Sequence, residues 1–301
     1  MSRTASEIAT RPGCRRRAAG AGAAFDGLPR PGERVAVTGC GTSWFMAIAY
    51  AALREAAGQG ETDAYPSSEF PAGRPCDRVV AITRSGTTTE VLELLGELRG
   101  KVATVAPAGP GTPVTDATDA VTVLDWADEE SVVQTRFATT APAFLRAGLE
   151  ASGPLPAGVK TVAAAAVDAE LAVTEPLDEA LAAAEQWTFL GRGWTYGPAQ
   201  EAGLKMREAA GARTESYPAM EYRHGPISIT GPHRVARVSG PLPEGPAGDV
   251  ARVGGTLVAH ATADPMADLI RAQQLAVEPA ESKGYDPDHP RNLSRSVILS
   301  P

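Results

Sequence analysis

Three charged residues on one predicted helix are spaced so that they could move a proton together. Glu201, Lys205 and Glu208 lie at i, i+4 and i+7, which places them on one helix face at about 100° per residue. The helix is otherwise mostly apolar, whereas an exposed helix usually carries charge on more faces. A neighbouring cation in a cleft tunes a carboxylate to act as a base. The alternative is a pair of surface Glu–Lys contacts, worth about 0.2–0.5 kcal/mol each.

A histidine follows in a predicted loop. The run Glu221-Tyr-Arg-His224-Gly-Pro226 forms a turn that ends at Gly-Pro. An imidazole transfers protons near neutral pH, so His224 could act as an acid or a base. A single loop histidine more often has no special role, so this prediction depends on which other candidate site residues accompany His224.

Two hydroxyl-rich turns follow predicted strands in the first half. Residues 83–89 read Thr-Arg-Ser-Gly-Thr-Thr-Thr and open a helix, and residues 39–43 read Gly-Cys-Gly-Thr-Ser one strand earlier. A helix N-terminus offers N–H groups and the positive end of the dipole, so hydroxyls there can help to hold an anion. Simple N-capping is the alternative for either turn alone. Neither turn has a dinucleotide or P-loop pattern.

The elements that position these residues occur twice. Gly39 and Gly191 each follow an apolar run, and Tyr65 and Tyr217 each precede proline; 191 − 39 and 217 − 65 both equal 152. The repeat indicates a duplicated unit of about 150 residues. Strands are predicted at Arg34–Thr38, Arg78–Thr83, Lys101–Ala106, Ala120–Leu124, Trp187–Leu190, Arg213–Tyr217, Arg234–Val238 and Thr256–Ala261. Helices are predicted at Trp44–Ala57, Thr88–Arg99, Thr135–Leu149, Tyr196–Ala210 and Pro265–Ser282.

Continuous apolar strands between helices predict an α/β fold with buried parallel sheets. In such sheets both hydroxyl-rich turns fall at the carboxyl ends of strands, where ligands bind. Arg15–Arg17 is read as a basic helical turn on the surface. The expected organisation is a leader (1–30), a first domain (31–150), a connector with a leading helix (151–186), a second domain (187–282) and a C-terminal arm (283–301).

Composition excludes several classes of protein. The formal net charge is −8, whereas a general nucleic-acid binder presents a basic surface. Three cysteines without CxxC spacing favour a reducing, cytoplasmic setting over disulfides, and the four histidines lack metal-ligand spacing, so no metal or other cofactor is expected. The sequence contains no stretch of about 18 apolar residues, so no membrane span is expected.

Taken together, the motifs resemble the sugar isomerase (SIS) family, in particular the tandem-SIS isomerase portion of glucosamine-6-phosphate synthase and its free-standing relatives. The resemblance extends from Gly39 to Leu293. The matching segments are Gly39–Ser43, Ser68–Phe70, Thr83–Thr88, Gly191–Gly193, Glu201–Glu208, Glu221–Pro226 and Asp286–Leu293.

This resemblance implies two tandem flavodoxin-like SIS domains, each a parallel sheet sandwiched by helices, in a homodimer with a shared active site. It gives Glu208 as the base that abstracts the C2 proton of an open-chain sugar and His224, from the other subunit, as the ring opener. Lys205 and Glu201 match assisting positions. The implied contacts to the sugar phosphate are Thr42, Ser43, Thr83, Arg84, Ser85 and Thr88, and further substrate contacts are Gln134 and Arg295.

Three departures from the family pattern shape the expected chemistry. Only Met1–Glu33 precede the first strand and Ser2 replaces a nucleophilic cysteine, so nitrogen transfer from glutamine is not expected. Arg295 stands where the synthase has a Schiff-base lysine, and arginine stays protonated. The usual Ser-Gln-Ser phosphate turn carries Arg84, whose fixed charge could bind phosphate or another substituent.

The expected substrate is an amino-sugar 6-phosphate, of the glucosamine or N-acetylglucosamine type, held between the two domains. Removal of the C2 proton leads to isomerisation with deamination, or to dehydration if the C3 hydroxyl leaves from an N-acetylated sugar. The sequence does not choose between these outcomes. The alternative is a non-catalytic sugar-phosphate sensor, because a fold alone does not fix function.

Overall fold

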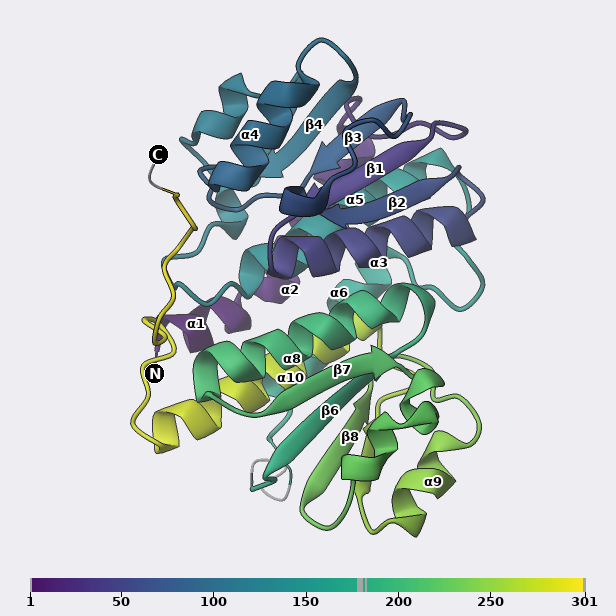
Figure 1. Ribbon diagram of the computed structural model, residues 1–301, viewed down its shortest axis with the longest axis vertical. Coiled ribbons are helices and arrows are strands. Elements are labelled where there is room, and N and C mark those ends of the chain that lie inside the picture. The colour runs from purple at the N-terminus through teal and green to yellow at the C-terminus, as the bar shows by residue number, and fades with distance from the viewer. Residues whose placement is uncertain (1, 178–180, 182, 300–301) are drawn as a thin grey trace. The chain divides into compact units, whose positions relative to one another are not determined.

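The chain forms two compact units, each built around one parallel sheet (Figure 1). The computed structural model describes residues 2–177, 181 and 183–299. The five-stranded unit consists of Gly13–Glu130, Gln134–Ala163 and Ser294–Pro301, and the four-stranded unit consists of Met1–Pro12, Ser131–Val133 and Ala164–Leu293. Each unit therefore combines segments that are far apart in the sequence.

The sheet of the five-stranded unit has the order β2-β1-β3-β4-β5, with every neighbouring pair parallel. This is the flavodoxin-like order, in which the switch point lies between the first and third strands. The predicted α/β fold with parallel sheets is confirmed. The strands are β1 (Val35–Gly39), β2 (Thr62–Pro66), β3 (Arg78–Ala81), β4 (Ala103–Ala108) and β5 (Ala120–Val123).

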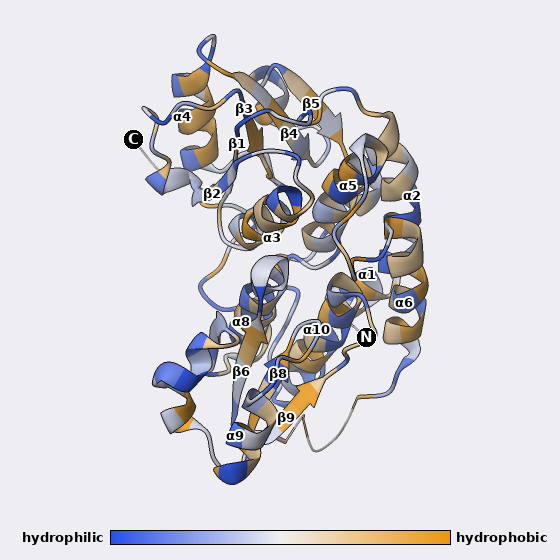
Figure 2. Cartoon of the chain, turned by 90° about the vertical axis from the view of Figure 1, so that its right-hand side faces the viewer, coloured by the Kyte–Doolittle hydropathy of each residue, from blue (hydrophilic) through white to orange (hydrophobic). Residues whose placement is uncertain are grey.

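Helices cover both faces of this sheet. Successive strand residues point to opposite sides, and the buried side chains on each side pack against a helix. Ala36 packs with Leu94 and Leu98 of α4, and the flanking Val35 and Val37 are buried on the other face, where α3 lies along β1 and β2. Figure 2 shows α4 with one hydrophobic and one hydrophilic side. The helical segments are α3 (Thr42–Ala56), α4 (Thr89–Leu98), α5 (Arg136–Ser152) and the 3-10 turns η1 (Ser67–Glu69), η2 (Pro113–Asp116) and η3 (Asp125–Ala127).

The sheet of the four-stranded unit repeats this order as β7-β6-β8-β9, again with parallel neighbours. Its strands are β6 (Gln186–Gly191), β7 (Thr214–Pro218), β8 (Arg234–Val238) and β9 (Thr256–Ala259). Its helical segments are α8 (Tyr196–Ala210), α9 (Pro246–Arg252), α10 (Pro265–Ser282), η4 (Gly193–Thr195), η5 (Glu221–His224) and η6 (Pro226–Ile229).

The two faces of this second sheet carry different elements. Helix α8 packs on β6 and β7 and against α10. Tyr222 of η5 and Val250 of α9 instead pack on Leu190, Ala236 and Val238 of the strands. Because the connections β6–β7 and β7–β8 run in opposite directions across the sheet, right-handed crossovers place them on opposite faces. The helix that carries Glu208 and the turn that carries His224 therefore cover opposite sides of one sheet.

The sequence repeat marks corresponding strands in the two units. Gly39 pairs with Pro66 across β1 and β2, and Gly191 pairs with Pro218 across β6 and β7. Strand β2 was not predicted, because its residues are mostly half-buried and its sequence, TDAYP, lacks a continuous apolar run. Its bounds equal those of β7 shifted by the same 152 residues.

Within the described residues, three further helices lie outside this strand–helix alternation: α1 (Arg3–Ala9), α2 (Arg11–Ala24) and α6 (Val162–Thr174). The surface prediction for Arg15–Arg17 is wrong for its first residue. Arg15 is 1% exposed, because the helical period of α2 places it on the same buried side as Arg11 and Ala18. Arg16 and Arg17 are exposed, as predicted. Residues 178–180 and 182 of the expected connector lie outside the described residues.

A buried ionic cluster joins β8 to α10. Arg237 donates from Nη2 to Asp268 Oδ1 at 2.5 Å, and His260 Nδ1 lies 2.8 Å from the same oxygen. Asp268 is 1% exposed. Burial alone would raise the pKa of Asp268, but the charge of Arg237, the hydrogen bond and charge of His260 and the charge of Arg271 together lower it below 3.8.

Replacing Asp268 with asparagine should lower the free energy of unfolding by about 3–5 kcal/mol, because Arg237 loses its buried partner. A lowered folded-state pKa means that this contribution is complete above pH 3.8 and disappears as the pH falls through the folded-state value. Urea unfolding at neutral pH and on acidification measures both effects. Asp125→Asn, at a pair with Arg17 that is more than half exposed, is the control and should cost under about 1 kcal/mol. Equal losses for the two variants would contradict the prediction.

Candidate functional site

The hydroxyl-rich turn of the five-stranded unit links the end of β3 to the start of α4. Thr83 forms a parallel bridge with Ala108, and its Oγ1 accepts a hydrogen bond from the Gly86 N–H at 3.1 Å. Gly86 has φ 57°, and a Cβ there would meet Thr112 Oγ1 at 2.3 Å, so only glycine fits. Thr83 therefore shapes the turn and leaves Ser85 and the threonines that follow it at the helix start.

The hydroxyl groups in this turn do not serve as an ordinary helix cap. Thr88 occupies the N-cap position of α4, but its side chain makes no capping hydrogen bond. Its Oγ1 lies 3.3 Å from Ser85 Oγ, and both side chains are partly exposed. Two neighbouring hydroxyls at the positive end of a ten-residue helix form an arrangement that can receive an anion.

The second turn begins α3 beside the first one. Thr42 and Ser43 are the first residues of α3, and each is 6% exposed. The N–H of Ile82, which leads into the Thr83 turn, donates to the Thr38 carbonyl of β1 at 2.9 Å. The ends of β1 and β3 are therefore held together, and both helix starts lie at the carboxyl end of the switch point, where doubly wound sheets bind ligands.

Arg84 and Arg295 belong to one hydrogen-bonded arrangement in this unit. Arg84 is 3% exposed and donates from Nη2 to the Arg295 carbonyl at 3.1 Å. Arg295 forms an ion pair with Asp128 at 2.5 Å and also donates to the Glu129 carbonyl. Arg84 therefore helps to fix the C-terminal arm, a role that the sequence did not indicate. Gln134 lies half-buried, two residues before α5.

The arm also meets the start of α4 directly. Thr87 Oγ1 donates to Ser296 Oγ at 3.0 Å, the Thr89 N–H donates to the Val297 carbonyl at 3.2 Å, and the Leu299 N–H donates to Thr89 Oγ1 at 2.9 Å. Thr87 and Thr89 thus bind the arm. Ser85 and Thr88 are the pair in this turn whose hydroxyls lie next to each other.

In the four-stranded unit, the predicted charged face of α8 is buried. Glu201 is 0% and Lys205 is 1% exposed, so these residues do not form a surface pair. Lys205 Nζ lies 3.6 Å from Glu201 Oε1 and also pairs with Glu208 Oε2. The buried Lys205 ammonium therefore lies between two carboxylates. The predicted common face of these three residues is confirmed.

Glu208 is the member of this trio that reaches a cavity. Its side chain is 17% exposed, and it lines a cavity of about 670 Å³ together with the start of the C-terminal arm. Such a volume accommodates a small polar ligand. The lining residues are Leu204, Arg207, Glu208, Ala209, Gly211, Gly284, Tyr285, Asp286, His289, Pro290, Arg291, Asn292 and Leu293.

Several of these lining residues were not predicted as site residues. Arg291 stacks over the Tyr285 ring at 4.8 Å, and Asp286 Oδ2 lies 3.0 Å from His289 Nδ1. The hydrogen bonds from His289 and from the Asp288 N–H lower the pKa of Asp286. The run Asp286-Pro-Asp-His-Pro-Arg-Asn-Leu293 could have indicated these residues, because it matches the SIS pattern. No catalytic or binding role was predicted for it.

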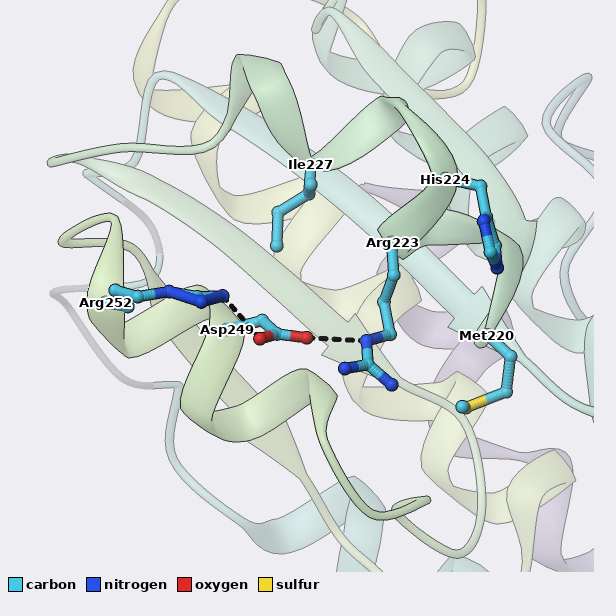
Figure 3. Close-up of a pocket in the computed structure, with 6 residues that line it drawn as sticks. All are labelled: Met220, Arg223, His224, Ile227, Asp249 and Arg252. Atoms are coloured by element: carbon cyan, nitrogen blue, oxygen red, sulfur yellow. Dashed lines mark hydrogen bonds and ion pairs between the residues drawn. The ribbon is translucent and has the colours of Figure 1, made fainter.

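His224 lines a different cavity from Glu208. It ends η5 and borders a hollow of about 500 Å³ with residues of η5, η6 and α9 (Figure 3). Within one copy of the chain the structure therefore groups Glu201, Lys205 and Glu208 but does not bring His224 to them.

The part of the chain that the structure describes lacks two kinds of feature. No group of three or more His, Cys, Asp or Glu residues there is arranged to hold a metal ion. Among the same residues, no helix is both long and apolar enough to cross a membrane.

Comparison with solved structures decides the fold. Glucosamine-6-phosphate deaminase from Thermotoga maritima superposes with a TM-score of 0.79 at 21% identity, covering 99% of this chain and 100% of that one. The C-terminal domain of glucosamine-fructose-6-phosphate aminotransferase from Francisella tularensis gives 0.75 at 20% identity, covering 96% and 98%. The chain has the fold of these sugar-phosphate proteins.

Sequence comparison points to the same group of proteins. The glutamine–fructose-6-phosphate aminotransferase (isomerizing) of Caulobacter vibrioides is 28% identical over 317 aligned residues, which cover 89% of this chain and 52% of that protein. The chain thus spans about half the length of the curated relatives it matches. No protein-family model matches it.

Proposed function

We propose that the chain acts on an amino-sugar 6-phosphate by removing the proton from C2, with Glu208 as the base. The observation that carries this proposal is the buried Glu201–Lys205–Glu208 trio, of which Glu208 lines a cavity. A carboxylate held by a buried ammonium is fixed in position, and the 17% exposed Glu208 side chain lines a cavity that a ligand can enter. The names of the similar proteins, a deaminase and an isomerizing aminotransferase, support the same substrate class.

The phosphate is assigned to the hydroxyl-rich turns of the five-stranded unit. Ser85 and Thr88 supply neighbouring hydroxyls at the start of α4, and Thr42 and Ser43 begin α3 at the adjacent strand end. Thr83 and Arg84 shape the turn and hold the arm beside it. The proposal requires that these turns and Glu208 act on the same sugar molecule, with the phosphate as its fixed end.

The reaction proceeds by proton transfers that the chain's own residues can supply. His224 protonates the ring oxygen as the C1–O5 bond breaks and the C1 hydroxyl loses its proton. Glu208 then takes the C2 hydrogen, the C–H electrons form a C1–C2 double bond, and the C1 carbonyl electrons move to O1, which takes up a proton. Return of the proton to C1 leaves an imine at C2, which water hydrolyses to a ketose 6-phosphate and ammonia. Arg295 forms no Schiff base, because it stays protonated and pairs with Asp128.

Proton NMR in D2O tests this function on the wild-type protein. With glucosamine 6-phosphate we expect ammonia release and a ketose 6-phosphate that carries deuterium at C1. With the N-acetyl form, loss of the C3 hydroxyl would instead reveal dehydration. The proposed function would be refuted if neither sugar turned over and neither took up deuterium at C1 or C2. Tight binding without exchange would favour a sensor.

A further inference from the structure

His224 depends for its position on a short turn. Helical turn η5 spans only Glu221–His224, and the next residue, Gly225, has φ 137° and leaves the helical path. Four residues in a 3-10 turn have little rigidity of their own. Side-chain contacts must therefore fix the turn if His224 is to be held in one orientation.

One contact anchors η5 on its inner side. Tyr222 is 0% exposed and packs against Leu190, Ala236 and Val238 of the sheet. Its hydroxyl forms a hydrogen bond with Thr230 Oγ1, beyond the end of η6. This anchor fixes the centre of the turn but leaves its last two residues, Arg223 and His224, towards the cavity.

A second contact anchors η5 on the cavity side. Arg223 donates from Nε to Asp249 Oδ2 at 2.6 Å, and Arg252 pairs with the other oxygen of Asp249 (Figure 3). The Asp249 side chain is 16% exposed, so water only partly competes with this pair. A short charge-assisted bond to a mostly covered carboxylate limits the freedom of Arg223.

The backbone is shaped to receive this arginine. Gly245 has φ 105° at the start of α9, and a Cβ there would lie 2.9 Å from Nη1 and 3.0 Å from Cζ of Arg223. Any other residue at position 245 would be strained and would push the guanidinium away from Asp249. The fit of Arg223 between Gly245 and Asp249 is thus built into the loop before α9.

We propose that Asp249 is a positioning residue for His224. It holds Arg223, whose backbone is bonded to that of His224, and so sets the direction in which the imidazole leaves the turn. The inference rests on the proposed function, in which His224 opens the sugar ring. Catalytic groups must be placed closely, since a misplacement of about 1 Å can lower a rate about 100-fold.

Asp249→Asn in the full-length protein tests this role. On glucosamine 6-phosphate, kcat should fall at least about tenfold with little change in KM, because only ring opening is affected. On the 4,5-dideoxy analogue, which lacks both hydroxyls that could close a ring, the variant should match the wild type. Arg252→Ala is the matched control: it removes the other partner of Asp249, is 68% exposed, and should leave both rates unchanged. Equal losses on the two substrates would overturn the proposal.

A second readout does not depend on turnover. Labelling histidine at ¹³Cε1 gives one NMR signal for each of the four histidines, and His224→Ala identifies that of His224. Asp249→Asn should shift or broaden this signal, whereas Arg252→Ala should not. An unchanged signal in Asp249→Asn would overturn the proposal even if the wild type proved active. If the wild type turned over no sugar phosphate, the proposed function would fail, and this spectrum would still decide whether Asp249 orders His224.

Discussion

Replacing Glu208 with glutamine is expected to lower kcat about 10³-fold or more, because an amide cannot take the C2 proton. The affinity for the sugar 6-phosphate should stay within about threefold, since glutamine has nearly the same shape and the phosphate contacts are intact. Lys205 keeps Glu201 as its carboxylate partner, so the helix should remain folded. Steady-state kinetics, together with calorimetric titration of the variant with substrate, measures both quantities.

The control for this variant is Glu97→Gln, which makes the same chemical change on an exposed residue of α4. It should leave both kcat and affinity unchanged. If the Glu208→Gln protein retained more than about a tenth of the wild-type kcat, Glu208 would not be the base.

Mixing two inactive variants is expected to restore activity if two subunits share each site. Glu208 lies on α8 and His224 on η5, and these elements cover opposite faces of one sheet. We therefore propose that His224 serves the Glu208 of the other subunit in a homodimer. A hybrid of Glu208→Gln and His224→Ala chains would contain one site with both lesions and one intact site.

Random reassembly of equal amounts makes half of the dimers hybrid, each with one working site of two. The mixture should therefore recover about a quarter of the wild-type activity, while each variant alone stays near background. Differently tagged chains show whether hybrids form. Hybrids that are demonstrably present but inactive would place Glu208 and His224 in the same chain's site, or outside any common site.

Among the described residues, the sequence predicted every strand except β2. Strands β1, β3 and β6 read as continuous hydrophobic runs because helices bury both of their faces. Strand β2 is mostly half-buried, so its pattern is weak. Its counterpart β7 was predicted, and applying the 152-residue repeat to β7 would have located β2.

The charged trio of α8 was predictable because helical spacing alone fixes which side chains share a face. The contacts of the arm were not, since residues more than 160 positions apart in sequence meet there. The sequence predicts Arg84 as a phosphate ligand, but nothing near Arg84 in the sequence indicates the Arg295 carbonyl to which it donates. The Arg223–Asp249 pair depends in the same way on how the loop before α9 folds.

A crystal structure of the Glu208→Gln protein with glucosamine 6-phosphate tests the central claim most directly, because the substrate should bind without reacting. We expect phosphate oxygens about 3 Å from the hydroxyls of Ser85 and Thr88, and C2 of the sugar about 3.5 Å or less from the side chain at position 208. A phosphate bound away from the Thr83–Thr88 turn, or a C2 atom out of reach of position 208 in every copy, would contradict the account.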